Sequence, residues 1–125
     1  MTSDLLLAIH LDDILRGGYL NDRPEGEVYQ PLPEYPSILA VNGLMMHEHG
    51  LHARPSEKLV DCAKRLGIGQ YYGVAVANGI TVSLLSIIGL LLLAARKGTI
   101  VSVVTQDVAP EGMMQLYRTL TTPIP

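Results

Sequence analysis

Asn78-Gly79 is the feature of the sequence that most constrains the fold, because it separates two short strand-like runs by only two residues. The runs are Tyr72–Ala77 and Ile80–Ser83. An Asn-Gly pair supplies the positive φ angles of the tight turn whose twist matches that of two paired strands. These residues therefore predict a β-hairpin and, with it, an antiparallel sheet.

The apolar runs on either side predict the elements around this hairpin. Ala53–Leu66 has apolar residues at three- and four-residue steps and charged residues on its other faces, which indicates an amphipathic helix. The other predicted elements are strands at Ile38–Met46 and Thr99–Thr105, a helix in the apolar run Leu84–Ala95, and a last helix from Pro110 through Leu120. Their order implies an α+β fold, in which an antiparallel sheet carries helices on one face.

Length and composition indicate one domain with a modest appendage. The chain has 125 residues, is 48% hydrophobic and contains no Phe or Trp, so its core is expected to be largely aliphatic. The single cysteine, Cys62, excludes an internal disulfide, and the first residues lack the basic segment and long apolar run of an export signal. We therefore expect a protein of the cytoplasm.

Residues 1–37 differ in composition from the rest of the chain. Asp4–Arg16 predicts a short helix, and the prolines between Asp22 and Pro36 predict an extended linker. This segment contains seven acids and two bases, whereas residues 38–125 contain five acids and seven bases. The sequence therefore predicts an acidic extension at 1–37 and a mildly basic domain at 38–125.

His52 is the residue whose position points most directly to chemistry. It lies where the cap of the Ala53–Leu66 helix is expected, after Gly50 has allowed a sharp turn. Unpaired amides, such as that of Ala53, and the positive end of the helix dipole favour a bound anion there, and the guanidinium of Arg54 suits phosphate oxygens. Pro55 is tolerated in the first helical turn. We therefore interpret His52 as a phosphoryl carrier with Ala53 and Arg54 as phosphate-binding residues.

The stretch Gly50-Leu51-His52-Ala53-Arg54-Pro55 resembles the active-site signature of HPr, the histidine-containing phosphocarrier family of the sugar phosphotransferase system. The resemblance continues through Asn78-Gly79-Ile80-Thr81-Val82, Ser86-Ile87-Ile88-Gly89 and Lys97-Gly98-Thr99, and covers roughly residues 38–121. It implies an open-faced sandwich of four antiparallel strands, in the order βαββαβα, with three helices on one face.

The same resemblance implies a relay with protein partners. Enzyme I would phosphorylate Nδ1 of His52, and the phosphoryl group would then pass to a histidine of an enzyme IIA domain. The protein would act as a phosphohistidine carrier rather than as an enzyme with a small-molecule substrate. We expect no cofactor and no bound metal for this function.

The apolar run that follows the hairpin predicts a docking surface. Ser86 corresponds to the serine that HPr kinase/phosphorylase modifies in some members of the family, and a phosphate there would oppose docking by charge and desolvation; the alternative is a plain helix cap. Ile87, Ile88 and Leu91 cannot all face inward together with their apolar neighbours, so they are expected to contact partners. The run is too short and interrupted for membrane insertion, and the small basic excess without an aromatic platform disfavours nucleic acid.

Two other functions fit parts of the sequence. His47, His49 and His52 have a spacing that could bind zinc or another transition metal. Alternatively, the chain is a regulatory HPr-like module that signals its phosphorylation state to a transcription factor or kinase, and the acidic extension at 1–37 favours this reading. In that case the extension could fold over the basic site.

Overall fold

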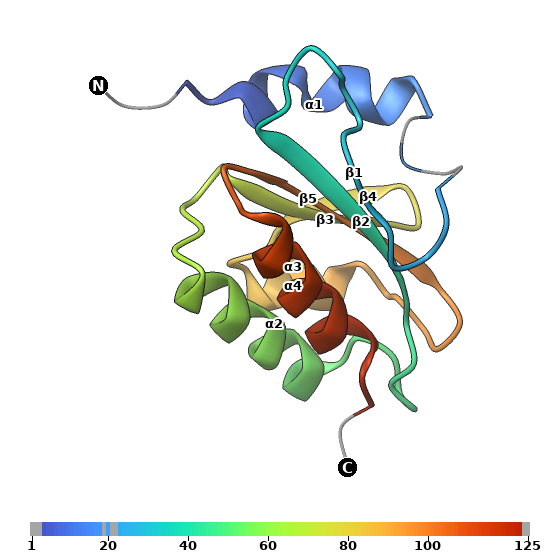
Figure 1. The fold of residues 1–125 in the computed structure, drawn as a ribbon. Coiled ribbons are helices and arrows are strands. Elements are labelled where there is room, and N and C mark those ends of the chain that lie inside the picture. The colour runs from blue at the N-terminus through green and yellow to red at the C-terminus, as the bar shows by residue number, and fades with distance from the viewer. Residues whose placement is uncertain (1–3, 19, 21–22, 124–125) are drawn as a thin grey trace.

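The computed structural model describes residues 4–18, 20 and 23–123. Within them the chain forms the following helices and strands, in order: α1 (Leu6–Arg16), β1 (Val28–Tyr29), β2 (Ile38–Leu44), α2 (Ala53–Arg65), β3 (Gly73–Ala77), β4 (Ile80–Ser83), α3 (Ile87–Leu92), β5 (Ile100–Gln106) and α4 (Pro110–Thr121). The helices α2, α3 and α4 lie on one side of the sheet, and α1 lies on the other (Figure 1).

The sheet has the strand order β1-β2-β5-β3-β4, and every neighbouring pair is antiparallel. Asn78 and Gly79 both have positive φ and join β3 to β4, so the predicted hairpin is confirmed. The first and last strands of the predicted domain, β2 and β5, pair along their whole length in the centre of the sheet. The α+β sandwich is therefore confirmed.

One feature of the predicted architecture needs correction. The sheet has five strands instead of four, because Val28 and Tyr29 in the predicted linker pair with Val41 and Ala40 of β2. Helix α1, which belongs to the predicted extension, adds a partial cover to the face of the sheet opposite α2, α3 and α4 (Figure 1). A strand of two residues is too short to show an alternating pattern, so the surrounding prolines led to the prediction of a linker there.

Successive side chains along the central strands point to opposite faces of the sheet. Val101 and Val103 of β5 point into the larger apolar cluster under α2, α3 and α4, whereas Val104 points into a second cluster under α1. The second cluster also contains Leu7 and Ile14 of α1. Two separate apolar cores therefore hold the helices to the two faces.

Helix α1 is capped at its N-terminus by the side chain of Gln106, the last residue of β5. Its N-cap residue, Leu5, makes no side-chain capping bond. Instead, the Oε1 of Gln106, in β5, accepts a hydrogen bond from the amide of Leu7 at 2.9 Å, and its Nε2 donates to the carbonyl of Asp4 at 2.5 Å. The end of α1 is therefore fixed by a residue 99 positions away.

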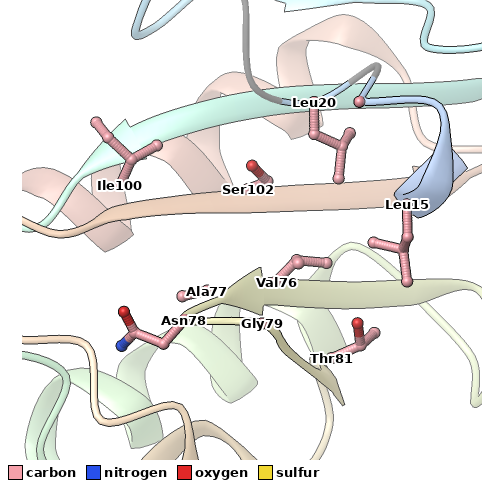
Figure 2. A pocket seen from close by; sticks show the side chains of 10 residues that line it. Leu15, Leu20, Val76, Ala77, Asn78, Gly79, Thr81, Ile100 and Ser102 are labelled. Carbon is pink, nitrogen blue, oxygen red and sulfur yellow. The ribbon is translucent and has the colours of Figure 1, made fainter.

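A pocket of about 310 Å³ remains where the C-terminal end of α1 stops short of the β3–β4 turn. Figure 2 shows Leu15 and Leu20 on one side of it, with Val76 and Ser102 on the strands below. It lies on the α1 side of the sheet, so α1 covers this face only in part.

Among the described helices, none combines the length and hydropathy needed to cross a bilayer.

Candidate functional site

The loop between β2 and α2 is held by the segment that follows α3. Gly50 has φ +72, and a Cβ there would collide with the carbonyl oxygen of Ala95, so the position needs glycine. The amide of Leu51 donates to the same carbonyl at 2.8 Å, and the Leu51 side chain is buried. The backbone at Gly50 and Leu51, which leads into His52, is therefore held against Ala95.

His52 is the N-cap residue of α2 and has an extended backbone, with φ −86 and ψ −168. Its ring is exposed and makes no side-chain capping bond, while its carbonyl accepts the amide of Ser56 at 3.0 Å. Because Pro55 has no N–H, the amides of Ala53 and Arg54 are the donors that the first helical turn leaves without an intrahelical partner. An exposed imidazole thus lies next to an amide-rich helix start, a setting that attracts anions.

The Arg54 side chain is exposed and, within the part of the chain that the structure describes, takes part in no ion pair. It lines a groove of about 350 Å³ between α2 and the end of α4, together with the following residues: Lys58, Asp61, Arg65, Thr119, Thr122 and Pro123. A guanidinium two residues after His52 can bind phosphate oxygens with two parallel hydrogen bonds. The three cations around one carboxylate make this groove basic.

A family model described as the PTS HPr component phosphorylation site matches residues 44–120. The chain belongs to the HPr family. A crystal structure of the phosphocarrier protein HPr from Bacillus anthracis str. Ames has the same fold, with a TM-score of 0.60 and 24% sequence identity over 68% of this chain and 99% of that chain. No curated protein sequence matches the chain significantly. The predicted family is therefore confirmed, and the protein is an HPr-type component of the phosphotransferase system.

In this HPr protein, the three histidines before α2 do not form a metal centre. The rings of His49 and His52 meet edge to face, with centroids 5.9 Å apart. His47 is buried, with 2% of its surface exposed, and packs against the end of α4. Among the described residues, no group of three His, Cys, Asp or Glu side chains is arranged to hold a metal ion. The sequence spacing suggested zinc because it could not show that His47 turns inward.

Helix α3 carries the predicted docking residues of the HPr fold. The Oγ of Ser86 caps the helix by accepting the amide of Gly89 at 2.9 Å. Ile87, Ile88 and Leu91 are exposed, and Ile88 is the most exposed of them at 73%. Leu92, which the sequence did not single out, is also exposed at 64%. The helix thus presents a continuous apolar patch, which we call the α3 patch (Ile87, Ile88, Leu91 and Leu92).

The acidic extension leaves the site uncovered. Helix α1 lies on the opposite face of the sheet from α2 (Figure 1), and both His52 and Arg54 are exposed. Glu25 of the extension reaches α4, where its carboxylate accepts a hydrogen bond from the Tyr117 hydroxyl. The described part of the extension, residues 4–18, 20 and 23–37, therefore does not fold over the basic groove.

Proposed function

We propose that this HPr protein accepts a phosphoryl group from enzyme I on Nδ1 of His52 and passes it to a histidine of enzyme IIA, in the cytoplasm. The observation that supports this is the exposed imidazole at the start of α2, next to two free amides and an unpaired guanidinium. The Nδ1 lone pair would attack the phosphorus atom as the bond to the donor histidine breaks, and that bonding pair would return to the donor. In the transfer to enzyme IIA, phosphorylated His52 is the donor and the histidine of enzyme IIA is the nucleophile.

Ala53 and Arg54 would stabilise the phosphoryl oxygens without forming a bond to them. The amides at the helix start donate hydrogen bonds, and Arg54 supplies the positive charge. Both lie at the surface, where water weakens the interaction, so the phosphoryl group can still leave. Binding of this kind accelerates transfer by positioning and charge rather than by covalent chemistry.

The α3 patch would dock partner proteins next to the site. Helix α3 contacts α2, and the carbonyl of Ala95, just after α3, holds Leu51 beside His52. A partner that covers Ile87, Ile88 and Leu91 would therefore reach the imidazole as well. The basic groove at Arg54 would favour an acidic surface on that partner.

Ser86 is a second modification site within this proposal. A phosphate on its Oγ, added by HPr kinase/phosphorylase, would introduce about −1.5 to −2 charges beside the α3 patch. It would also replace the capping bond to the Gly89 amide, where a Cβ at Gly89 would already lie 3.0 Å from Ser86 Oγ. Phosphorylation of Ser86 would therefore weaken docking of the partners that phosphorylate and dephosphorylate His52.

Incubation with enzyme I and labelled phosphoenolpyruvate tests the proposal. We expect the intact protein to acquire an acid-labile label and His52→Ala to acquire none, while His10→Ala, which changes a histidine of α1, labels normally. Arg54→Ala is expected to slow labelling by roughly tenfold, about 1.4 kcal/mol of lost transition-state stabilisation, with Arg118→Ala as the control. Label retained by His52→Ala would refute the site.

A regulatory module is the second candidate, and the covered second face of the sheet favours it. Helix α1 exposes Asp12, Asp13 and Ile9 on a layer that lies outside the family segment 44–120. Such a layer could contact a transcription factor or kinase while His52 is being phosphorylated. A labelled protein that fails to pass its phosphoryl group to enzyme IIA would support this reading over the carrier.

A further inference from the structure

His47 is a buried histidine for which the fold supplies no hydrogen bond. Only 2% of it is exposed, and within the described chain neither Nδ1 nor Nε2 has a hydrogen-bond partner. A neutral imidazole has one N–H donor and one acceptor nitrogen, and buried polar groups of this kind are nearly always paired. Apolar packing alone would be served better by a leucine, so the ring requires another explanation.

The surroundings of the ring contain both possible acceptors and the reactive histidine. The backbone carbonyls of Thr119 and Leu120, at the end of α4, lie close enough to act on the imidazole, although neither meets hydrogen-bond geometry. His52 acts on the ring electrostatically. His47 therefore lies between the C-terminal, negative end of one helix and the site at the start of another.

These surroundings disfavour the charged form of the ring. Burial lowers the pKa of His47, the Thr119 carbonyl raises it, and positive charge on His52 lowers it further. Of the charged neighbours in the loop, Glu48 is exposed and pairs with Lys97 at 3.2 Å, and the ring of His49 faces His52. Of the titratable groups in the described chain, His52 is the one that acts on the His47 ring.

We propose that His47 is a positioning residue that takes up a proton when His52 is phosphorylated and then donates hydrogen bonds to the carbonyls of Thr119 and Leu120. This inference rests on the proposed function of His52. In the transfer step the Nδ1–P bond forms and the bond to the donor breaks, with its electron pair leaving on the donor. The phosphoryl group brings negative charge close to His47, and the proton that balances part of this charge comes from solvent.

The consequence is a phosphorylation equilibrium that depends on pH. Because the phosphorylated protein would bind one proton more than the free protein, acid would favour phosphorylation, by at most tenfold per pH unit between the two titration midpoints of His47. The imidazolium would also fix the loop from Met45 to His52 against α4 while the phosphoryl group is in place. On transfer to a partner, the proton would be released and the loop would loosen.

NMR titration of the His47 ring tests this coupling directly in the full-length protein. We would phosphorylate His52 with phosphoramidate, a small chemical donor, and follow the His47 ring protons against pH before and after. The midpoint is expected to rise by about one unit or more, because a negative charge near a buried imidazole favours its protonated form. A midpoint that does not move on phosphorylation would overturn the proposal.

A pair of substitutions at His52 makes the test independent of phosphorylation. His52→Glu places a fixed negative charge at the site, and His52→Gln is the uncharged match. The His47 midpoint should be higher in the Glu variant than in the Gln variant, and equal midpoints would contradict the coupling. If phosphoramidate and enzyme I both fail to label His52, the proposed function fails, while this pair still decides whether His47 senses charge there.

The pH profile of phosphorylation provides the functional measurement. The ratio of phosphorylated to free protein at equilibrium with phosphorylated enzyme I is measured between pH 5.5 and 8.5 for the intact protein, His47→Gln and the control His10→Gln. The gain in phosphorylation on the acid side should appear in the intact protein and in His10→Gln, and it should be absent in His47→Gln. Identical profiles would show that His47 has only a structural role.

Discussion

The two faces of the sheet are covered by layers that differ in construction. Helices α2, α3 and α4 cover one face through a large apolar cluster, and almost the whole of this layer lies within the family segment 44–120. Helix α1 covers the other face through a smaller apolar cluster and lies outside that segment. The first layer exposes its chemically useful groups, His52 and the α3 patch, whereas the second is attached by buried polar side chains in addition to its apolar cluster.

The polar attachments of the second layer converge on Asn42 and Gln106. The Oδ1 of Asn42 accepts hydrogen bonds from Ser102 Oγ at 2.8 Å and from the Tyr29 hydroxyl at 3.2 Å, and its Nδ2 donates to the carbonyl of Leu20 at 2.6 Å. Gln106 caps α1. Buried groups that are fully paired specify one arrangement, because every alternative leaves some of them unpaired. A layer can thus be added to the HPr fold without any contact with the site.

Ile14→Ala gives the largest expected effect and tests whether the second layer contributes to folding. Ile14 is fully buried in the cluster under α1, so removing three carbons should lower the free energy of unfolding by about 2–4 kcal/mol. Urea unfolding would measure this, with Ile9→Ala, at a position 65% exposed on the same helix, as the control. A cost below about 0.5 kcal/mol would show that α1 is not part of the cooperative unit.

The layer that carries the site was largely predictable from local sequence. Asn78-Gly79, the amphipathic pattern of Ala53–Leu66 and the six residues around His52 each specify structure within a few residues of themselves, so the family and the α+β class could be inferred. The length of α3 could not, because the apolar run Leu84–Ala95 contains no visible stop. In the structure α3 ends at Leu92, and Ala94 adopts a positive φ just after it.

Only part of the second layer could be predicted. The helix expected at Asp4–Arg16 is confirmed as α1 (Leu6–Arg16), but its place on the sheet could not be predicted, because the residues that attach it are far apart in the sequence. The start of α1 has no capping residue of its own and depends on Gln106. The strand β1 is recognisable only through its backbone pairing with β2. The direction of the His47 ring depends on where α4 ends, which also lies far along the chain. Periodicity reports burial along one element, but not which distant element covers it.

Gln106→Ala tests whether the two layers are independent, and its expected effect on stability is intermediate. The substitution removes both hydrogen bonds at the start of α1 and leaves the buried amide of Leu7 without a partner, which should cost about 1–2 kcal/mol of unfolding free energy. Gln70→Ala, at an exposed loop position, is the matched control. Labelling of His52 by enzyme I should remain unchanged, since Gln106 acts on the other face. A defect in labelling as large as the loss in stability would show that the two layers are coupled.

Tyr29→Phe gives the smallest expected effect, which is a change in how stability depends on pH above about pH 10. Burial raises the pKa of Tyr29 to about 12, more than Arg23 and the hydrogen bond to Asn42 lower it. Between pH 10 and 12 the unfolded chain therefore loses the phenolic proton before the folded protein does, so stability falls as pH rises through this window. At pH 11 the intact protein should have lost about 1 kcal/mol more, relative to pH 9, than the Phe variant.

The comparison between the two proteins isolates Tyr29, because every other group titrates equally in both. Urea unfolding at pH 9 and pH 11 is sufficient, with Tyr71→Phe, an exposed tyrosine in the loop before β3, as the control that should keep the slope of the intact protein. If Tyr29→Phe loses as much stability as the intact protein between these pH values, the hydroxyl is not held inside the polar network. The hydroxyl would then add nothing to the attachment of the second layer, which would rest on its apolar cluster and on the hydrogen bonds of Asn42 and Gln106.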